Sequence, residues 1–175
     1  MNKLLLSLMA LLSCGGEHKL PNVITEPEES FDWAATTMVE YRYGDSSVAP
    51  EYHRSYTISI TESHMAIAIN SYGNVLLKKE YPNTPADFKA FKEELSKKGI
   101  KKRRKKKEDP CDGGTSETIR LYKDDVKYFD AYVYHCSGDQ GTLVIPAGTA
   151  ALICRQLPEN VDSLIESTFP KFDNN

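Results

Sequence analysis

The chain has 175 residues, of which 40% are apolar, 27% charged and 10% aromatic, and its formal net charge is −3. This composition is typical of a soluble globular domain and excludes collagen-like, coiled-coil and wholly disordered chains. A chain of this length can bury a substantial core without metals or many disulfides. It has no room for a second domain of normal size.

The N-terminus carries the features of an export signal. Lys3 supplies a positive charge, and the nine residues from Leu4 to Leu12 are apolar except for Ser7. As a helix this stretch would be about 14 Å long, less than half of a ~30 Å hydrocarbon core. The pattern therefore predicts a secretory signal and not a membrane-spanning helix.

The stretch from Leu11 to Gly15 has an apolar residue three positions before Cys14 and a small residue on each side of it. It resembles the lipobox of bacterial lipoproteins. The resemblance implies that residues 1–13 are removed, that Cys14 receives a diacylglycerol thioether and that the new amino terminus is acylated. Several acyl chains would hold the protein stably on membrane lipid. The alternatives are an ordinary secreted protein and an uncleaved anchor.

The expected location is the bacterial cell envelope. Gly15 does not match the aspartate that retains some lipoproteins in the inner membrane, so the outer membrane is favoured. Residues 14–30 are polar and contain two prolines, which predicts a lipidated N-terminus followed by a flexible tether. Residues 31–175 are predicted to form a single domain.

The first part of this domain alternates apolar and polar residues, the pattern of half-buried strands. Alternation begins at Met38 and returns over residues 56–60, 65–69 and 75–81. Because the turns between the last three segments are short, these segments must be antiparallel neighbours, and a meander is predicted.

The apolar spacing then changes to that of a helix over residues 85–98. Thr84 can cap the helix, Pro85 suits its first position, and Gly99 suits its C-terminal end. Its apolar side chains fall on one face and need a sheet to cover; they are Phe88, Phe91 and Leu95.

The second half repeats the order of strands followed by helices. Strands are predicted over residues 117–123, 127–136 and 142–145, and helices from Gly148 or Thr149 and over 161–169, with Pro158 ending or kinking the first helix. The fold class predicted is α+β, an antiparallel sheet with two or three helices packed on one face.

Tyrosines alternate along the strand that leads to Cys136. Tyr128, Tyr132 and Tyr134 share one face, while Phe129 and Val133 share the other. Two apolar faces indicate a central strand. We expect the tyrosines to pack beneath a helix with their hydroxyls at the rim, and regard a sugar or peptide site as the less favoured reading.

Three cysteines remain after lipidation, and export predicts that they fold under oxidising conditions. Cys111 and Cys136 lie in polar, glycine-containing contexts at the two ends of a hairpin, so they are predicted to form a disulfide. Cys154 lies in an apolar helical stretch and is predicted to stay reduced and buried. No zinc site is expected, because His135 and Cys136 are adjacent on a strand and point to opposite faces.

The most unusual segment runs from residue 97 to residue 107, where nine of eleven residues are basic. They are Lys97, Lys98, Lys101, Lys102, Arg103, Arg104, Lys105, Lys106 and Lys107. The rest of the mature chain has 12 basic and 25 acidic residues. The asymmetry suggests contact with anionic headgroups or another polyanion; the alternative is a solvated loop or an edge strand whose lysines discourage pairing. Nucleic acid is not an expected partner of a lipoprotein.

Catalytic and cofactor-binding motifs are missing from the sequence. There is no Gly-x-Ser-x-Gly, no phosphate-binding glycine loop, no His-Glu-x-x-His and no dinucleotide fingerprint. We therefore expect a non-enzymatic interaction or structural module of the envelope, without cofactor or metal, that is held on membrane lipid through acylated Cys14 and contacts either anionic headgroups or an envelope protein. The alternative is an inhibitor or immunity protein that acts on an envelope hydrolase through the loop at 109–116 or at 137–141.

Overall fold

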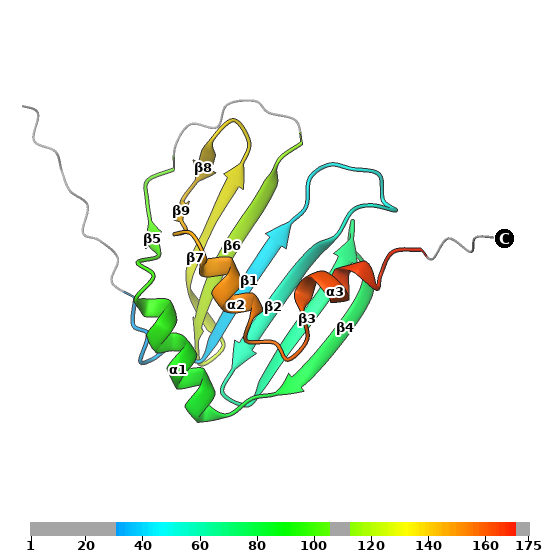
Figure 1. Cartoon of the computed structure of the whole chain (residues 1–175). Coiled ribbons are helices and arrows are strands. Elements are labelled where there is room, and N and C mark those ends of the chain that lie inside the picture. The colour runs from blue at the N-terminus through cyan, green and yellow to red at the C-terminus, as the bar shows by residue number, and fades with distance from the viewer. Residues whose placement is uncertain (1–30, 106–112, 171–175) are drawn as a thin grey trace, which may run out of the picture.

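The computed structural model describes residues 31–105 and 113–170. Seven strands form one antiparallel sheet in the order β4-β3-β2-β1-β6-β7-β8 (Figure 1). They are β1 Met38–Gly44, β2 Ser55–Thr61, β3 His64–Ser71, β4 Asn74–Pro82, β6 Thr115–Lys123, β7 Val126–His135 and β8 Asp139–Gly141. β5 Lys101–Lys102 pairs with β9 Leu143–Val144 in a second, two-stranded sheet.

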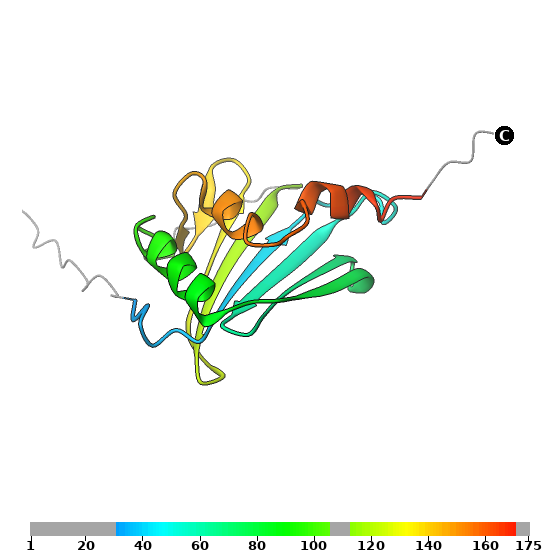
Figure 2. The ribbon, with the colours of Figure 1, turned by 60° about the horizontal axis from the view of Figure 1, so that its bottom comes forward.

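Three helices accompany the sheet: α1 Pro85–Ser96, α2 Thr149–Cys154 and α3 Val161–Glu166. All three lie on the same side of the sheet (Figure 2). The predicted α+β class, with helices packed on one face of an antiparallel sheet, is confirmed.

The predicted meander is confirmed for β1 to β4, whose neighbours pair in chain order. The two halves of the chain meet where β1 also pairs with β6, with Tyr41 opposite Ile119. This pairing makes β1 the middle strand of the seven. Sequence periodicity does not reveal it, because the two strands are far apart in the chain.

The core lies between the sheet and the helices. Alternate residues of each central strand point into it, as the spacing of two requires. The strands contribute Val39, Tyr41, Ile58, Ile60, Ile67, Ile69, Ile119, Leu121, Phe129 and Val133, and the helices contribute Phe88, Phe91, Leu95, Leu152, Ile153, Val161 and Leu164.

α1 begins as predicted and ends slightly earlier. The Thr84 side chain accepts a hydrogen bond from the Asp87 amide and the Thr84 hydroxyl donates to the Asp87 carboxylate. The helix ends at Ser96 instead of residue 98, with Lys97 as its C-terminal cap. Gly99 follows with a φ of 72°, a conformation that favours glycine.

Three other predicted elements also differ in extent. The strand expected over 142–145 is reduced to the two residues of β9, and β8 precedes it; Gly141, the last residue of β8, has a φ of 95° and turns the chain between them. The helix expected over 161–169 ends at Glu166. α2 ends at Cys154, well before Pro158.

The tyrosine face of β7 lies opposite to the expected side. Phe129 and Val133 are buried beneath the helices, whereas Tyr128 remains 40% exposed on the other face. β7 is also bordered by β8 only over Val133–His135, so most of it is not a central strand. Both expectations were wrong. They followed the apolar character of the tyrosine rings, whereas the charge of Asp130, which lies on the same face, indicated that this face is open to solvent.

The loop between β1 and β2, residues 45–54, is held by buried polar side chains. Arg54 is 5% exposed, and its guanidinium donates to the hydroxyl and carbonyl of Thr168 and lies over the Phe169 ring. The His53 ring stacks on Tyr72 with 4.1 Å between centroids. These contacts fix a loop that has no regular secondary structure of its own.

Candidate functional site

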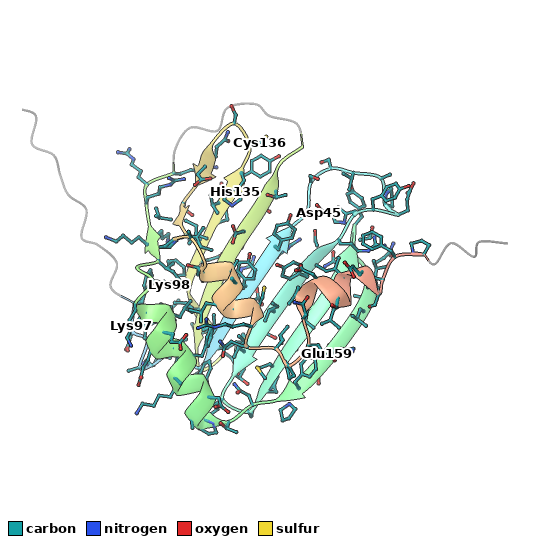
Figure 3. All side chains as sticks on the ribbon, in the orientation of Figure 1. Asp45, Lys97, Lys98, His135, Cys136 and Glu159 are labelled. Carbon is teal, nitrogen blue, oxygen red and sulfur yellow. The ribbon has the colours of Figure 1, made fainter. Side chains whose placement is uncertain are left out.

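The basic segment begins where α1 ends and continues along β5. Lys97 is exposed and Lys98 is half-buried, both at the end of the helix (Figure 3). Arg104 is also exposed. No ion pair between described residues involves these three side chains. Lys101, Lys102 and Lys105 are also exposed but each takes part in an interaction. Lys106 and Lys107 lie outside the described residues.

Arg103 fixes the segment to the rest of the fold. Its amide donates to the Thr142 carbonyl over 2.7 Å. Its guanidinium donates to two β8 carbonyls, Gly141 at 3.2 Å and Asp139 at 2.9 Å. The pairing of β5 with β9 adds a second attachment. Within the described part of the segment, Lys101–Lys102 therefore form a short strand, and Lys97, Lys101, Lys102, Arg104 and Lys105 are exposed to solvent.

The segment lies on the same side of the domain as the N-terminal end of the described chain (Figures 1 and 2). Residues 33–37 pack against α1, where the Lys92 ammonium donates to the Thr36 carbonyl over 2.8 Å. Ser96, at the end of α1, lines the same cavity as Trp33. A tether that precedes residue 31 would thus enter the domain next to the helix that leads into the basic segment.

The predicted lipidation site and one predicted disulfide partner, Cys14 and Cys111, lie outside the described residues. Cys136 is buried directly after β7 and is disulfide-bonded. Its pairing with Cys111 stays a prediction. Cys154 is a free cysteine, as expected, but is half-buried instead of buried.

The Cys154 thiol borders a cavity of about 540 Å³ between α2, α3 and the sheet. Burial raises its pKa, and the Tyr56 hydroxyl lies 3.8 Å from its sulfur. A thiol whose pKa is raised has little of the thiolate that nucleophilic chemistry needs. The position of Cys154 supports a packing role.

A second polar cluster, which the sequence reasoning missed, lies on the helix-covered face near the end of β7. The His135 Nε2 lies 2.9 Å from Glu117 Oε1, and its Nδ1 lies 2.7 Å from Asp139 Oδ1. The Tyr41 hydroxyl donates to the other oxygen of Glu117 over 2.7 Å. The sequence did contain a signal for this cluster, because Glu117 is an acid on the same strand face as the apolar residues Ile119 and Leu121.

Two carboxylates favour the charged form of the His135 imidazole. Burial alone would lower its pKa, but the hydrogen bonds to Asp139 and Glu117 outweigh burial and leave the pKa above its ordinary 6.5. Both ring nitrogens face carboxylates, so neither is available as a base. The cluster links β1, β6, β7 and β8 through hydrogen bonds between the His135 imidazole, two carboxylates and the Tyr41 hydroxyl, so its role is structural.

Among residues 31–105 and 113–170, no three histidine, cysteine or acidic side chains are placed to hold a metal ion. No helix within these ranges is long and apolar enough to cross a membrane. Comparison of the chain with protein-family models, curated proteins and solved structures gave no match.

Proposed function

We propose that the protein is a lipoprotein of the bacterial cell envelope, anchored through Cys14, whose domain acts by binding and not by turnover. In this proposal the basic segment contacts an anionic surface. The observation that carries the proposal is the position of this segment, beside the N-terminal end of the described domain. An anchor that precedes the domain brings the same side toward the membrane.

The energetics of such a contact are favourable. A basic residue close to an anionic leaflet contributes about 1 kcal/mol, and the contribution falls off within a Debye length of about 8–10 Å. Because β5 and Arg103 hold the segment at the edge of the fold, several cations can approach the surface together. The anchor supplies the stable attachment, and the segment orients the domain.

The anchor is tested by replacing its cysteine. We expect Cys14→Ala to move the protein from the membrane fraction to the soluble fraction of the cell, because the thioether cannot form. Cys154→Ala is the matched control and should leave the protein with the membrane. Retention of Cys14→Ala in the membrane fraction would contradict the anchor.

The basic segment is tested with the unlipidated Cys14→Ala protein and vesicles of defined composition. It should bind vesicles with 30% anionic lipid and not neutral vesicles, and binding should weaken as salt is raised. Substituting Lys97, Lys98 and Arg104 with glutamine should weaken binding at least tenfold, since each cation contributes up to about 1 kcal/mol.

The control for charge carries the same number of substitutions elsewhere, at Lys78, Lys123 and Lys127. It should bind like the parent protein, because these side chains lie on β4, β6 and β7 and do not belong to the basic segment. Equal weakening by both sets of substitutions would show a net-charge effect only and would overturn the assignment to the basic segment.

A further inference from the structure

A cavity of about 660 Å³ lies between α1 and residues 33–37, with the β2–β3 turn at one end. This volume is in the range of small-molecule binding sites. Its apolar walls come from Trp33, Ala34, Pro85 and Phe88, and Thr37 also lines it. None of these residues belongs to the basic segment.

The cavity is elongated. Its lining runs along α1 from the first residue of the helix, Pro85, to the last, Ser96. Twelve helical residues span about 18 Å. A cavity of this length, open to solvent along an apolar wall, suits an extended chain better than a compact ring.

One of the cations that line the cavity, Lys92, lies against its apolar wall. The Lys92 ammonium lies over the Phe88 ring, 4.8 Å from the ring centroid. The ammonium donates to the carbonyls of Thr36 and Ala34 at 2.8 and 3.5 Å, and an ammonium has three N–H donors. One donor remains for a ligand.

The Lys92 charge has no carboxylate partner. No ion pair between described residues involves Lys92, and burial lowers its pKa although Glu62 and Asp32 act in the opposite direction. The other charged side chains that line the cavity are exposed, so water screens them more strongly; they are Glu62, Lys89 and Glu93. A partly desolvated cation is stabilised when an anion meets it.

We propose that this cavity binds a long-chain carboxylate, with the alkyl chain along α1 between Trp33 and Phe88 and the carboxylate on the Lys92 ammonium. The apolar walls would contact the alkyl chain of the ligand, and the remaining N–H of Lys92 would donate to its carboxylate. The proposal does not depend on the membrane anchor or on the basic segment, since it uses other residues.

Trp33 provides the measurement, because it is the only tryptophan in the chain and lines the cavity. The full-length Cys14→Ala protein is titrated with dodecanoate, with dodecanol and with a short-chain anionic phospholipid, each below its micelle concentration. We expect saturable changes in Trp33 emission with the two single-chain compounds and tighter binding of dodecanoate. Tighter binding of the phospholipid than of dodecanoate would overturn the assignment to a free carboxylate.

The role of Lys92 is tested by Lys92→Gln, which removes the charge and keeps a donor for the Thr36 carbonyl. It should weaken dodecanoate binding at least tenfold and change dodecanol binding less than twofold. Lys123→Gln, a control on the exposed end of β6, should change neither. Equal weakening of both compounds by Lys92→Gln would contradict a charge contact.

A second variant tests the cavity itself. Ala34→Leu places a larger side chain in the wall and should weaken both dodecanoate and dodecanol at least fivefold, while the far-ultraviolet circular dichroism stays unchanged. Non-saturable emission changes, or binding that Ala34→Leu leaves intact, would show adsorption elsewhere on the surface and would overturn the proposal.

Discussion

Phe91→Ala should lower the free energy of unfolding by about 3–5 kcal/mol, the range for removing a buried aromatic ring. Phe91 is 2% exposed and packs α1 on the sheet. The loss combines the transfer free energy of the ring with the cost of the cavity left behind. Urea denaturation followed by circular dichroism measures it, with Phe91→Leu as a milder variant in case the alanine protein does not fold.

The control for Phe91→Ala is Lys89→Ala, on the exposed side of the same helix. It should change the free energy of unfolding by no more than about 0.5 kcal/mol. A loss below about 1 kcal/mol for Phe91→Ala would mean that α1 does not pack on the sheet as described. Because the basic segment begins at the end of α1, its position depends on the same packing.

Glu117→Ala should lower the free energy of unfolding by about 2–4 kcal/mol, because it removes the acceptor of the buried Tyr41 hydroxyl and one of the two carboxylates that bind His135. Glu117→Gln should cost less, since an amide oxygen still accepts from Tyr41. Urea denaturation at pH 6 and pH 9 measures both variants. A change within 0.5 kcal/mol of the parent for Glu117→Ala would contradict the cluster.

The dependence on pH separates the two contacts of Glu117. The pKa of His135 is raised in the folded protein, so the stabilisation from its charge is present below the ordinary value of 6.5 and is lost as pH rises through the folded pKa. Glu117→Gln should therefore destabilise the protein more at pH 6 than at pH 9. The Tyr41 pKa is raised mainly by burial, so its phenol stays neutral and its share of the Glu117→Ala loss should be equal at both pH values.

The elements of this fold could be predicted largely from local patterns. A spacing of two identified the strands, and Thr84, Pro85 and the Phe88–Leu95 stripe identified α1, because these signals depend on near neighbours. The pairing of β1 with β6 could not be predicted, since it depends on contacts between distant residues. The covered face of β7 was predicted wrongly because aromatic rings suit both buried and open sheet faces.

The candidate sites were less accessible to sequence reasoning. The basic segment was visible as composition, but its attachment through Arg103 to β8 depends on how two distant loops meet. Lys92 lies next to Phe91 on an otherwise ordinary amphipathic helix, and nothing in the spacing separates it from the exposed Lys89. The cavity beside it forms only when residues 33–37 fold back on α1.

The buried guanidinium of Arg54 has a consequence for the order of events during biosynthesis. Two of its acceptors belong to Thr168, 114 residues later in the chain. Until the segment that contains Thr168 has been synthesised, the guanidinium has only the nearby carbonyls of Pro50 and His53 to compensate its dehydration. The final packing of the loop between β1 and β2 therefore follows the synthesis of that segment, an order that suits a protein which, under the proposed function, passes through a narrow translocation channel before it folds.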